Sequence, residues 1–226
     1  MGPVFVVVPA YNESKRITTV IKDLRSHGYK NIVVIDDGSK DNTGEVAVAA
    51  GATVLTHLVN RGQGAGLRTG IEYALLHGAS VIVTFDSDGQ HLASEIKKLL
   101  APLTGNVDVV LGSRYLGIDT AHIPFIRRVL HFGSRVIIYL FYGLWMTDAH
   151  NGFRAFSRKA ALRIDIRSNR MEHASEIIGE IKRQGLRYIE VPVFIRYTDE
   201  TMQKGAGGFM GALRILSKMI LQKLTR

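Results

Sequence analysis

The chain has 226 residues, enough for one compact domain with a sizeable core but too few for a second full domain. Hydrophobic residues make up 46% and charged residues 22%, a balance that excludes wholesale disorder, and the absence of cysteine excludes disulfides and thiolate metal sites. Lysine and arginine outnumber aspartate and glutamate by 29 to 20, and the net charge of +9 favours polyanionic partners such as nucleic acid, anionic lipid headgroups or phosphorylated substrates.

The N-terminus carries no visible secretory signal. The longest apolar run, Val136 to Met146, has roughly eleven residues, whereas a helix that spans a bilayer needs about 20. We therefore expect a cytoplasmic protein that is soluble or lies peripherally on the cytoplasmic face of a membrane.

Apolar β-branched runs and segments of helical periodicity alternate along the first half of the chain. Val4 to Val8 is such a run, ended by Pro9, and is typical of a strand buried on both faces. Strands are predicted at 4–8, 31–35, 53–57, 80–85 and 107–111, and helices at 14–27, 43–50, 62–77 and 93–103. This alternation predicts an α/β fold with a mostly parallel sheet and helices on both faces.

The second half is less regular. It predicts helices at 123–142 and 174–184 and a strand at 187–193. From Phe209 to Arg226 the apolar residues line one side and lysines and arginines occupy the others, which predicts a basic amphipathic helix. We accordingly expect one α/β domain over residues 1–208 and a C-terminal helix over 209–226.

Polar motifs follow the predicted strands of the first half. Because parallel strands end at the same edge of a sheet, and ligands of such sheets bind there, these motifs are expected to converge. They are Tyr11-Asn12-Glu13, Asp36-Asp37, Asn60-Arg61-Gly62, Asp86-Ser87-Asp88 and Gly112-Ser113-Arg114.

Asp86-Ser87-Asp88 places two carboxylates directly after a buried strand, a costly location unless a cation or hydrogen-bond donors compensate. The two acids are predicted to point to the same side and to share a divalent ion that also neutralises a diphosphate. Gln90 and His91 follow closely and could add ligands. The alternative is a solvated turn.

The glycine-rich segment Gly62 to Gly66 stands where a strand gives way to a helix, and backbone N–H groups at that place suit phosphate. A tight turn explains the same glycines. Asp36 and Asp37 could bind a base or ribose, or cap a helix and form a turn. Pro9 and Tyr11 could present an aromatic face to a base, or Tyr11 could simply pack.

The ordered set of these motifs resembles family 2 glycosyltransferases, in particular the dolichyl-phosphate mannose synthase-like branch. The resemblance continues through the second half of the chain. The motifs that carry it are 9–13, 36–39, 60–65, 86–91, 112–114, 148–154 and 171–176.

The resemblance implies a GT-A fold, an inverting transfer from a nucleoside-diphosphate sugar and a Mg²⁺ or Mn²⁺ cofactor, with a polyprenyl phosphate as acceptor and no nucleic acid partner. Each implied role falls on a matched residue. Pro9, Tyr11, Glu13 and Asp37, joined by Asp36, would bind the nucleoside, Gly62 and Gly64 the phosphates, Asp86, Asp88 and Gln90 the metal, and Arg114, Arg127 and Lys204 phosphate groups of the substrates.

Two alternatives stay open within this family. If the acceptor is a glycan hydroxyl, a general base is required, and Glu172, Glu176 or Asp148 would supply it. The other is a non-catalytic nucleotide-binding subunit, against which the intact acid pair argues. The chain also lacks the C-terminal membrane helices of many relatives, so the basic helix at 209–226 is expected to lie on the membrane, dock on a small membrane protein, or pack on the domain.

Overall fold

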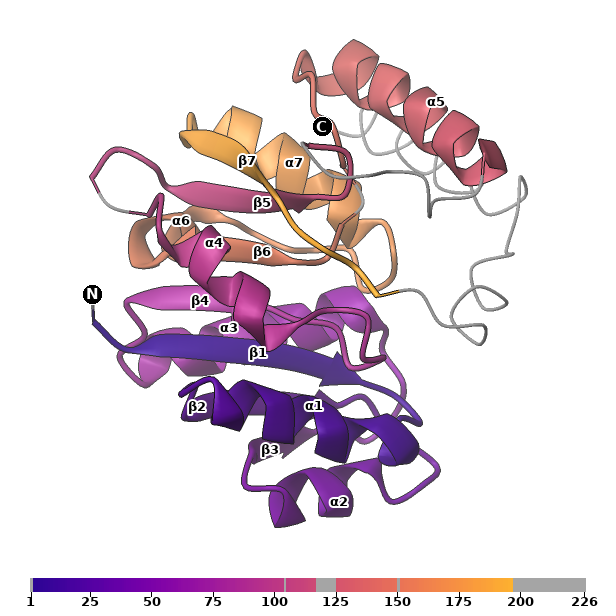
Figure 1. The fold of residues 1–226 in the computed structure, drawn as a ribbon, viewed down its shortest axis with the longest axis vertical. Coiled ribbons are helices and arrows are strands. Elements are labelled where there is room, and N and C mark those ends of the chain that lie inside the picture. The colour runs from indigo at the N-terminus through magenta and orange to yellow at the C-terminus, as the bar shows by residue number, and fades with distance from the viewer. Residues whose placement is uncertain (1, 104, 117–124, 150, 197–226) are drawn as a thin grey trace.

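The computed structural model describes residues 2–103, 105–116, 125–149 and 151–196. Seven strands form one sheet in the order β3-β2-β1-β4-β6-β5-β7 (Figure 1). The strands are β1 (Val4–Ala10), β2 (Asn31–Asp36), β3 (Thr53–Thr56), β4 (Val81–Thr84), β5 (Val109–Ser113), β6 (Arg154–Ser157) and β7 (Tyr188–Pro192).

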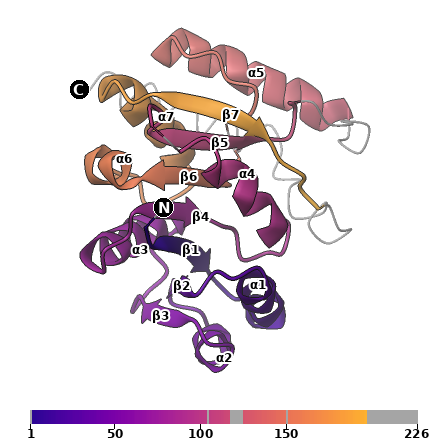
Figure 2. The same ribbon diagram turned by 60° about the vertical axis from the view of Figure 1, so that its left-hand side comes forward.

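The helices are α1 (Ser14–Ser26), α2 (Thr43–Ala49), α3 (Gln63–Leu76), α4 (Ile96–Leu100), α5 (Phe125–Tyr142), α6 (Arg158–Arg163) and α7 (His173–Arg183), with a 3₁₀ turn at Ala93–Glu95. Figures 1 and 2 show α1 and α4 over one face of the sheet and α3, α6 and α7 over the other. None of the described helices is both long enough and apolar enough to cross a membrane.

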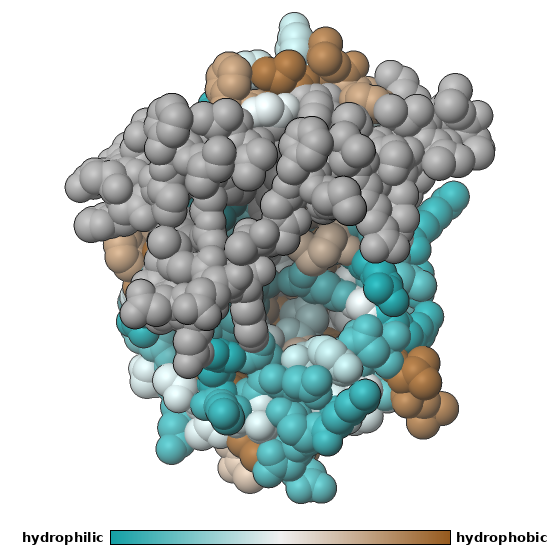
Figure 3. All heavy atoms as spheres, turned by 90° about the vertical axis from the view of Figure 1, so that its right-hand side faces the viewer, coloured by the Kyte–Doolittle hydropathy of each residue, from teal (hydrophilic) through white to brown (hydrophobic). Residues whose placement is uncertain are grey.

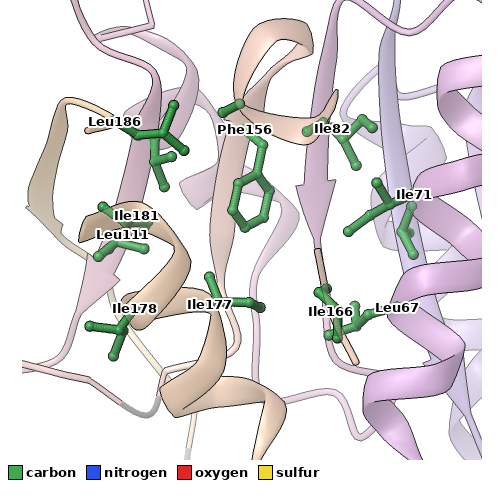
Figure 4. Packing of buried hydrophobic residues seen from close by; sticks show 14 of the residues in the cluster. Leu67, Ile71, Ile82, Leu111, Phe156, Ile166, Ile177, Ile178, Ile181 and Leu186 are labelled. Carbon is green, nitrogen blue, oxygen red and sulfur yellow. The ribbon is translucent and has the colours of Figure 1, made fainter. Parts of the chain in front are cut away.

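Each face of the sheet packs its own hydrophobic core, which explains the continuous apolar run of β1. Val6 and Val8 join α1 and α4 in one cluster, while Phe5 and Val7 join α3 and α7 in the other. Figure 4 shows the second cluster, where Leu67 and Ile71 of α3 and Ile177 of α7 surround the strands. Because successive side chains of a strand point to opposite faces, a strand covered on both sides must be apolar throughout.

The α/β fold and the mostly parallel sheet predicted from the sequence are confirmed. β1, β2, β3 and β4 pair in parallel, and so do β5 and β7. The exception is β6, which the sequence did not predict and which runs antiparallel between β4 and β5. α6, also unpredicted, follows it directly.

The helix predicted over 93–103 has different limits in the structure. The segment predicted as one helix over 93–103 begins with a 3₁₀ turn, and its α-helix ends at Leu100. Pro102 explains the early end, since proline has no N–H with which to continue the helical hydrogen bonds. The helix predicted over 123–142 is confirmed as α5 from Phe125 onward, and its predicted start at residue 123 lies outside the described ranges. The predicted C-terminal helix at 209–226 also lies outside them, so the predicted boundary at 208 stays a prediction.

Candidate active site

The polar motifs do gather at the carboxyl ends of the strands. Tyr11 follows β1, Asp37 follows β2, His57 follows β3 and Asp86 comes two residues after β4. Figure 3 looks onto this edge, toward which β1 points in Figure 1, and shows a hollow whose rim, where its residues are described, is mainly hydrophilic. The parallel register of β1 with β2 and β4 places these residues side by side.

The carboxylate of Asp86 is held on both oxygens. Gln63, the first residue of α3, donates its Nε2 hydrogen to Asp86 Oδ1 at 3.0 Å, and His91 Nε2 lies 3.3 Å from Oδ2. His91 Nδ1 accepts the backbone N–H of Asp86 at 3.0 Å, so its proton must reside on Nε2 and point to the carboxylate. The orientation of Asp86 is therefore set before any ligand arrives.

His91 itself is held by aromatic packing. Its ring is buried and stacks on Phe153 with centroids 4.6 Å apart, while Phe85 meets both rings edge-on. Burial lowers the pKa of His91, although the nearby charge of Asp86 acts to raise it. A neutral imidazole keeps the Nε2–H tautomer that the carboxylate needs.

Asp88 lies two residues after Asp86 in the same loop. Its Oδ1 accepts the backbone N–H of Gln90 at 2.9 Å, which folds residues 88–90 back toward the sheet. Gly89, with a φ of 79°, makes this turn possible. The loop does form a turn here, but its residues are buried or half-buried rather than freely solvated, and one of its two acids, Asp86, is fixed by Gln63 and His91.

β6 brings two further residues to Asp86. A Cβ atom built on Gly152 would lie 2.9 Å from Asp86 Oδ1 and 3.0 Å from Oδ2, so only glycine fits there. Thr84 locks this approach by donating its hydroxyl to the carbonyl of Gly152 at 2.6 Å. Arg154, with 3% exposure, donates from Nε to the carbonyl of Asn151 at 2.9 Å.

Arg154 supplies a buried positive charge beneath the acids. Burial lowers its pKa to about 10, while the charges of Asp86 and Asp148 act to raise it. It therefore remains a cation at neutral pH and offsets the cost of two carboxylates in a poorly solvated place.

Arg114, predicted to bind phosphate, is oriented by Asp148. Its Nε donates to Asp148 Oδ2 at 2.6 Å and its Nη2 donates to Oδ1 at 2.7 Å, a bidentate pair. The backbone N–H of Arg114 also donates to Oδ2, at 3.1 Å. Asp148 was one of three predicted general bases, but here its fully buried carboxylate fixes the arginine.

The predicted nucleoside residues are largely engaged in holding loops. Asp37 accepts from His57 Nδ1 at 2.7 Å and from the backbone N–H groups of Arg61 and Gly62 at 3.0 and 2.7 Å. Asp36 accepts the N–H of Ser39 at 3.0 Å, and Glu13 pairs with Arg16 at 2.9 Å. These bonds shape the rim around β1 and β2.

Tyr11 is exposed at the same rim and Pro9 is buried in β1. Tyr11 is thus free to meet a base, while Pro9 packs beneath α3, close to Gly66. The nucleoside roles of Pro9, Tyr11, Glu13, Asp36 and Asp37 stay predictions.

The glycine-rich segment makes close contacts with residues 168–170. Cβ atoms built on Gly62 and Gly64 would lie 2.5 Å from the carbonyl oxygen of Asn169 and 2.1 Å from that of Ser168. Gly62 also has a φ of 104°, and Ala65 donates its N–H to Asn169 at 3.1 Å. These glycines have a clear packing role, and phosphate binding by Gly62 and Gly64 stays a prediction.

Glu172 and Glu176, the other predicted bases, are both buried near the start of α7. Glu176 Oε2 accepts the backbone N–H groups of Arg167 at 3.1 Å and Ser168 at 2.7 Å. Glu176 thereby holds the loop that packs on the glycines of α3. Its neighbour His173 has a pKa lowered to about 4 by burial, with the charge of Arg154 acting in the same direction.

Two predicted phosphate contacts are not placed. Arg127 belongs to the first turn of α5, but its side chain is not among those described, and Lys204 lies outside the described ranges. Gln63, Gly152 and Arg154 are the residues that sequence reasoning missed as contributors. Gly152 and Arg154 did stand in a recognised motif, but no local pattern indicated that an antiparallel strand would bring them to Asp86.

The donor set fits a hard divalent cation. The described residues include no group of three or more His, Cys, Asp or Glu side chains arranged around one ion. Mg²⁺ in a diphosphate site commonly takes only one or two carboxylates from the protein and completes its shell with water and phosphate oxygens. Asp86 and Asp88, with partly exposed oxygens at a hollow edge, meet that requirement.

Comparison with known proteins agrees with this geometry. Residues 5–164 match the family model described as glycosyl transferase family 2. An uncharacterised protein of Methanocaldococcus jannaschii is 44% identical over 98% of this chain and 92% of its own length.

Two further relatives have named activities. The UDP-N-acetylglucosamine–dolichyl-phosphate N-acetylglucosaminyltransferase of Methanococcus voltae is 32% identical over 98% of this chain and 96% of its own. The polyprenol monophosphomannose synthase of Mycolicibacterium smegmatis is 28% identical over 89% and 80%.

The fold also matches a solved structure. Glucosyl-3-phosphoglycerate synthase from Mycobacterium tuberculosis, crystallised with UDP, superposes with a TM-score of 0.70 at 20% identity, over 96% of this chain and 79% of that one. The family match covers most of the chain and includes Asp86, Asp88, Arg114 and Arg154. The chain therefore belongs to glycosyl transferase family 2 and has the GT-A fold.

Proposed function

We propose that this protein transfers a sugar from a nucleoside-diphosphate sugar to a polyprenyl phosphate, with a Mg²⁺ or Mn²⁺ ion held by Asp86 and Asp88. The observation that carries the donor side is the fixed carboxylate of Asp86 at the carboxyl edge of the sheet, next to the nucleoside rim of β1 and β2. Other solved glucosyl-3-phosphoglycerate synthase structures contain Mn²⁺ or Mg²⁺ together with UDP.

The chain's own residues prepare this site. Gln63 and His91 fix the carboxylate of Asp86, whose side chain remains partly exposed, and the cation of Arg154 offsets its charge. When bound there, a divalent ion would act as a Lewis acid that offsets the charge on the departing nucleoside diphosphate. The ligands need little reorganisation, which is the main requirement for electrostatic stabilisation of a leaving group.

A phosphate acceptor is favoured over a glycan hydroxyl by the state of two of the three predicted bases. Asp148 is paired on both oxygens with Arg114, and Glu176 binds two backbone amides. Neither is in a position typical of a general base, which needs to reach the acceptor proton. A phosphate acceptor is already an anion and needs no base, and Arg114 provides an oriented cation for it. The named relatives act on dolichyl phosphate and polyprenol phosphate, according to their names.

We further propose that transfer takes place at the cytoplasmic face of a membrane, where such lipid acceptors would be met. The net charge of +9 suits a surface of anionic headgroups. The proposed C-terminal helix at 209–226 would take part, by contacting the membrane or a small membrane protein.

A transfer assay tests the function. Radiolabelled UDP-N-acetylglucosamine, UDP-glucose and GDP-mannose are each incubated with undecaprenyl phosphate in detergent, with and without Mn²⁺, and lipid-extractable label is counted. We expect one of the three donors to label the lipid extract, and to do so only when Mn²⁺ is present. Asp88→Ala should abolish transfer, while Asp165→Asn, at an exposed acid that pairs with Arg167 at the surface, should not.

Binding separates the competing functions. Mn²⁺-dependent thermal stabilisation by UDP or GDP supports the donor site, because a ligand that binds only the folded state raises its melting temperature. Stabilisation by NAD⁺ without metal, the result expected if the glycine-rich segment Gly62 to Gly66 bound a dinucleotide instead, would overturn the assignment. Transfer to a glycan rather than to the lipid phosphate would support the hydroxyl alternative.

A further inference from the structure

Glu190 lies on β7, at the edge of the sheet and outside every motif recognised in the sequence. Its carboxylate is directed at the segment before Asp148. Oε1 accepts from the N–H and hydroxyl of Thr147 at 2.9 and 2.8 Å and from the N–H of Asp148 at 3.0 Å, while Oε2 accepts the Thr147 N–H at 2.8 Å. Three donors of two consecutive residues therefore converge on one acid.

The segment that Glu190 holds also carries the partner of Arg114. Asp148 makes the bidentate pair with the Arg114 guanidinium, and its side chain is 0% exposed whereas that of Arg114 is 16% exposed. The buried acid thus anchors one edge of the guanidinium, and the position of this acid depends on its own backbone. Thr147 adds a second tie, because its hydroxyl lies 2.6 Å from the hydroxyl of Ser113, the residue before Arg114.

The contacts form one continuous path from β7 to the site. A carboxylate that accepts several N–H bonds gives charge-assisted interactions, which are stronger than neutral ones. A guanidinium recognises an anion by its plane and direction as well as by its charge, so a shift of its anchor changes binding even when the charge remains. Outer residues of this kind can alter binding without touching the ligand.

We propose that Glu190 is a positioning residue for the acceptor phosphate, which acts through Thr147 and Asp148 to fix the direction of Arg114. This inference rests on the proposed function, since it takes Arg114 to bind that phosphate. It predicts that changes at Glu190 weaken recognition of the phosphate group and leave recognition of the isoprenoid chain and of the donor intact.

The test measures binding to the full chain in detergent. The probes are farnesyl phosphate, farnesol, which lacks the phosphate, and UDP with Mn²⁺. Glu190→Leu removes every hydrogen bond that the Glu190 carboxylate accepts from Thr147 and Asp148. Glu190→Asp keeps the charge but is one methylene too short to reach the 147–148 amides, and it carries the test if the leucine variant does not fold. We expect both to weaken farnesyl phosphate binding by about tenfold, the loss of roughly one well-made hydrogen bond to a charged group, with farnesol and UDP unchanged. Glu190→Gln, which retains one acceptor oxygen for the three donors, should stay within about threefold.

Asp108 provides a matched control. It is a buried acid that accepts the N–H of Arg187 at 3.0 Å, and it thereby joins the segments just before β5 and β7, away from Arg114 and residues 147–148. Asp108→Asn should lower the melting temperature without changing the affinity for farnesyl phosphate. A loss of phosphate affinity in this variant as large as that in Glu190→Asp would mean that general destabilisation explains both, and would overturn the inference.

Arg114→Ala separates this inference from the function on which it rests. If Arg114→Ala weakens farnesyl phosphate binding and the two disruptive Glu190 variants do not, the positioning role is wrong and the proposed function stands. If Arg114→Ala has no effect, the assignment of Arg114 to the acceptor phosphate fails as well. If Glu190 acts through Arg114, the double variant Arg114→Ala with Glu190→Leu should bind farnesyl phosphate no more weakly than Arg114→Ala alone.

Discussion

Replacing Gly152 with alanine puts a methyl group against the carboxylate of Asp86. The new Cβ would lie 2.9 and 3.0 Å from its two oxygens, and ordinary contact begins at 3.4 Å, so one side must move by about half an ångström. Neither side can retreat easily, because Gln63 and His91 hold the carboxylate and Thr84 holds the Gly152 carbonyl.

Two effects of Gly152→Ala follow from this displacement. Overpacking of this kind typically costs about 1 to 3 kcal/mol in the free energy of unfolding. A displaced ligand should weaken Mn²⁺-dependent UDP binding and slow transfer by roughly 10- to 100-fold, the usual effect of disturbing the support of a metal ligand. Calorimetric titration with UDP, at saturating Mn²⁺ and without Mn²⁺, measures how much of the UDP affinity depends on the metal. Urea unfolding measures the stability.

Gly133→Ala, in α5, is the matched control. No heavy atom that the structure describes lies within 4 Å of a Cβ built there, so this change should leave transfer intact and add about 0.5 to 1 kcal/mol of stability through helix propensity. A folded Gly152→Ala variant with full transfer and unchanged Mn²⁺ dependence would refute the idea that Asp86 must stay where Gly152 allows it to be.

Three further predictions concern residues around Asp86. Since the pKa of His173 is lowered from 6.5 to about 4, the unfolded state binds an extra proton between these values, so the free energy of unfolding should fall by on the order of 3 kcal/mol as the pH drops from 6.5 to 4. In urea titrations, the free energy of unfolding of His173→Gln should depend less steeply on pH than that of the wild type. An equally steep dependence would contradict the lowered pKa of His173. Arg154→Met leaves the buried carbonyls of Ala149 and Asn151 without their donor and removes a cation near Asp86, so it should cost about 1 to 3 kcal/mol in urea unfolding at pH 7, whereas wild-type stability would show that neither contribution matters. Gln63→Leu removes the hydrogen bond to Asp86 and should raise the Mn²⁺ concentration needed for UDP binding by roughly three- to tenfold, which a titration with metal at fixed UDP would measure.

Much of the site could be predicted because its residues follow local patterns. The β-branched run of β1 and the apolar segment before Asp86 identify strands without knowledge of their neighbours, and acids that directly follow buried strands must lie at the sheet edge. The predictions for β2, β3, β5 and β7 are confirmed for the same reason. The order of the motifs along the chain was sufficient to indicate the family.

The contacts that orient the site follow no local pattern. β6 has four residues and begins with an arginine, so neither alternation nor length distinguishes it from a loop. Its antiparallel place between β4 and β5 depends on pairing with residues about 45 to 75 positions away, and this pairing brings Gly152 and Arg154 to Asp86.

The acids predicted as general bases show the same limit. Asp148 and Glu176 have the right chemistry for proton transfer, but hydrogen-bond partners distant in sequence decide how their oxygens are used. By itself, the sequence determined the parallel strands and the sheet edge at which the polar motifs gather, Asp86 and Asp88 among them, because these depend on periodicity and position within short segments. Only the tertiary structure decided which side chains fix Asp86 and Arg114, because those contacts arise when strands far apart in the chain pack side by side.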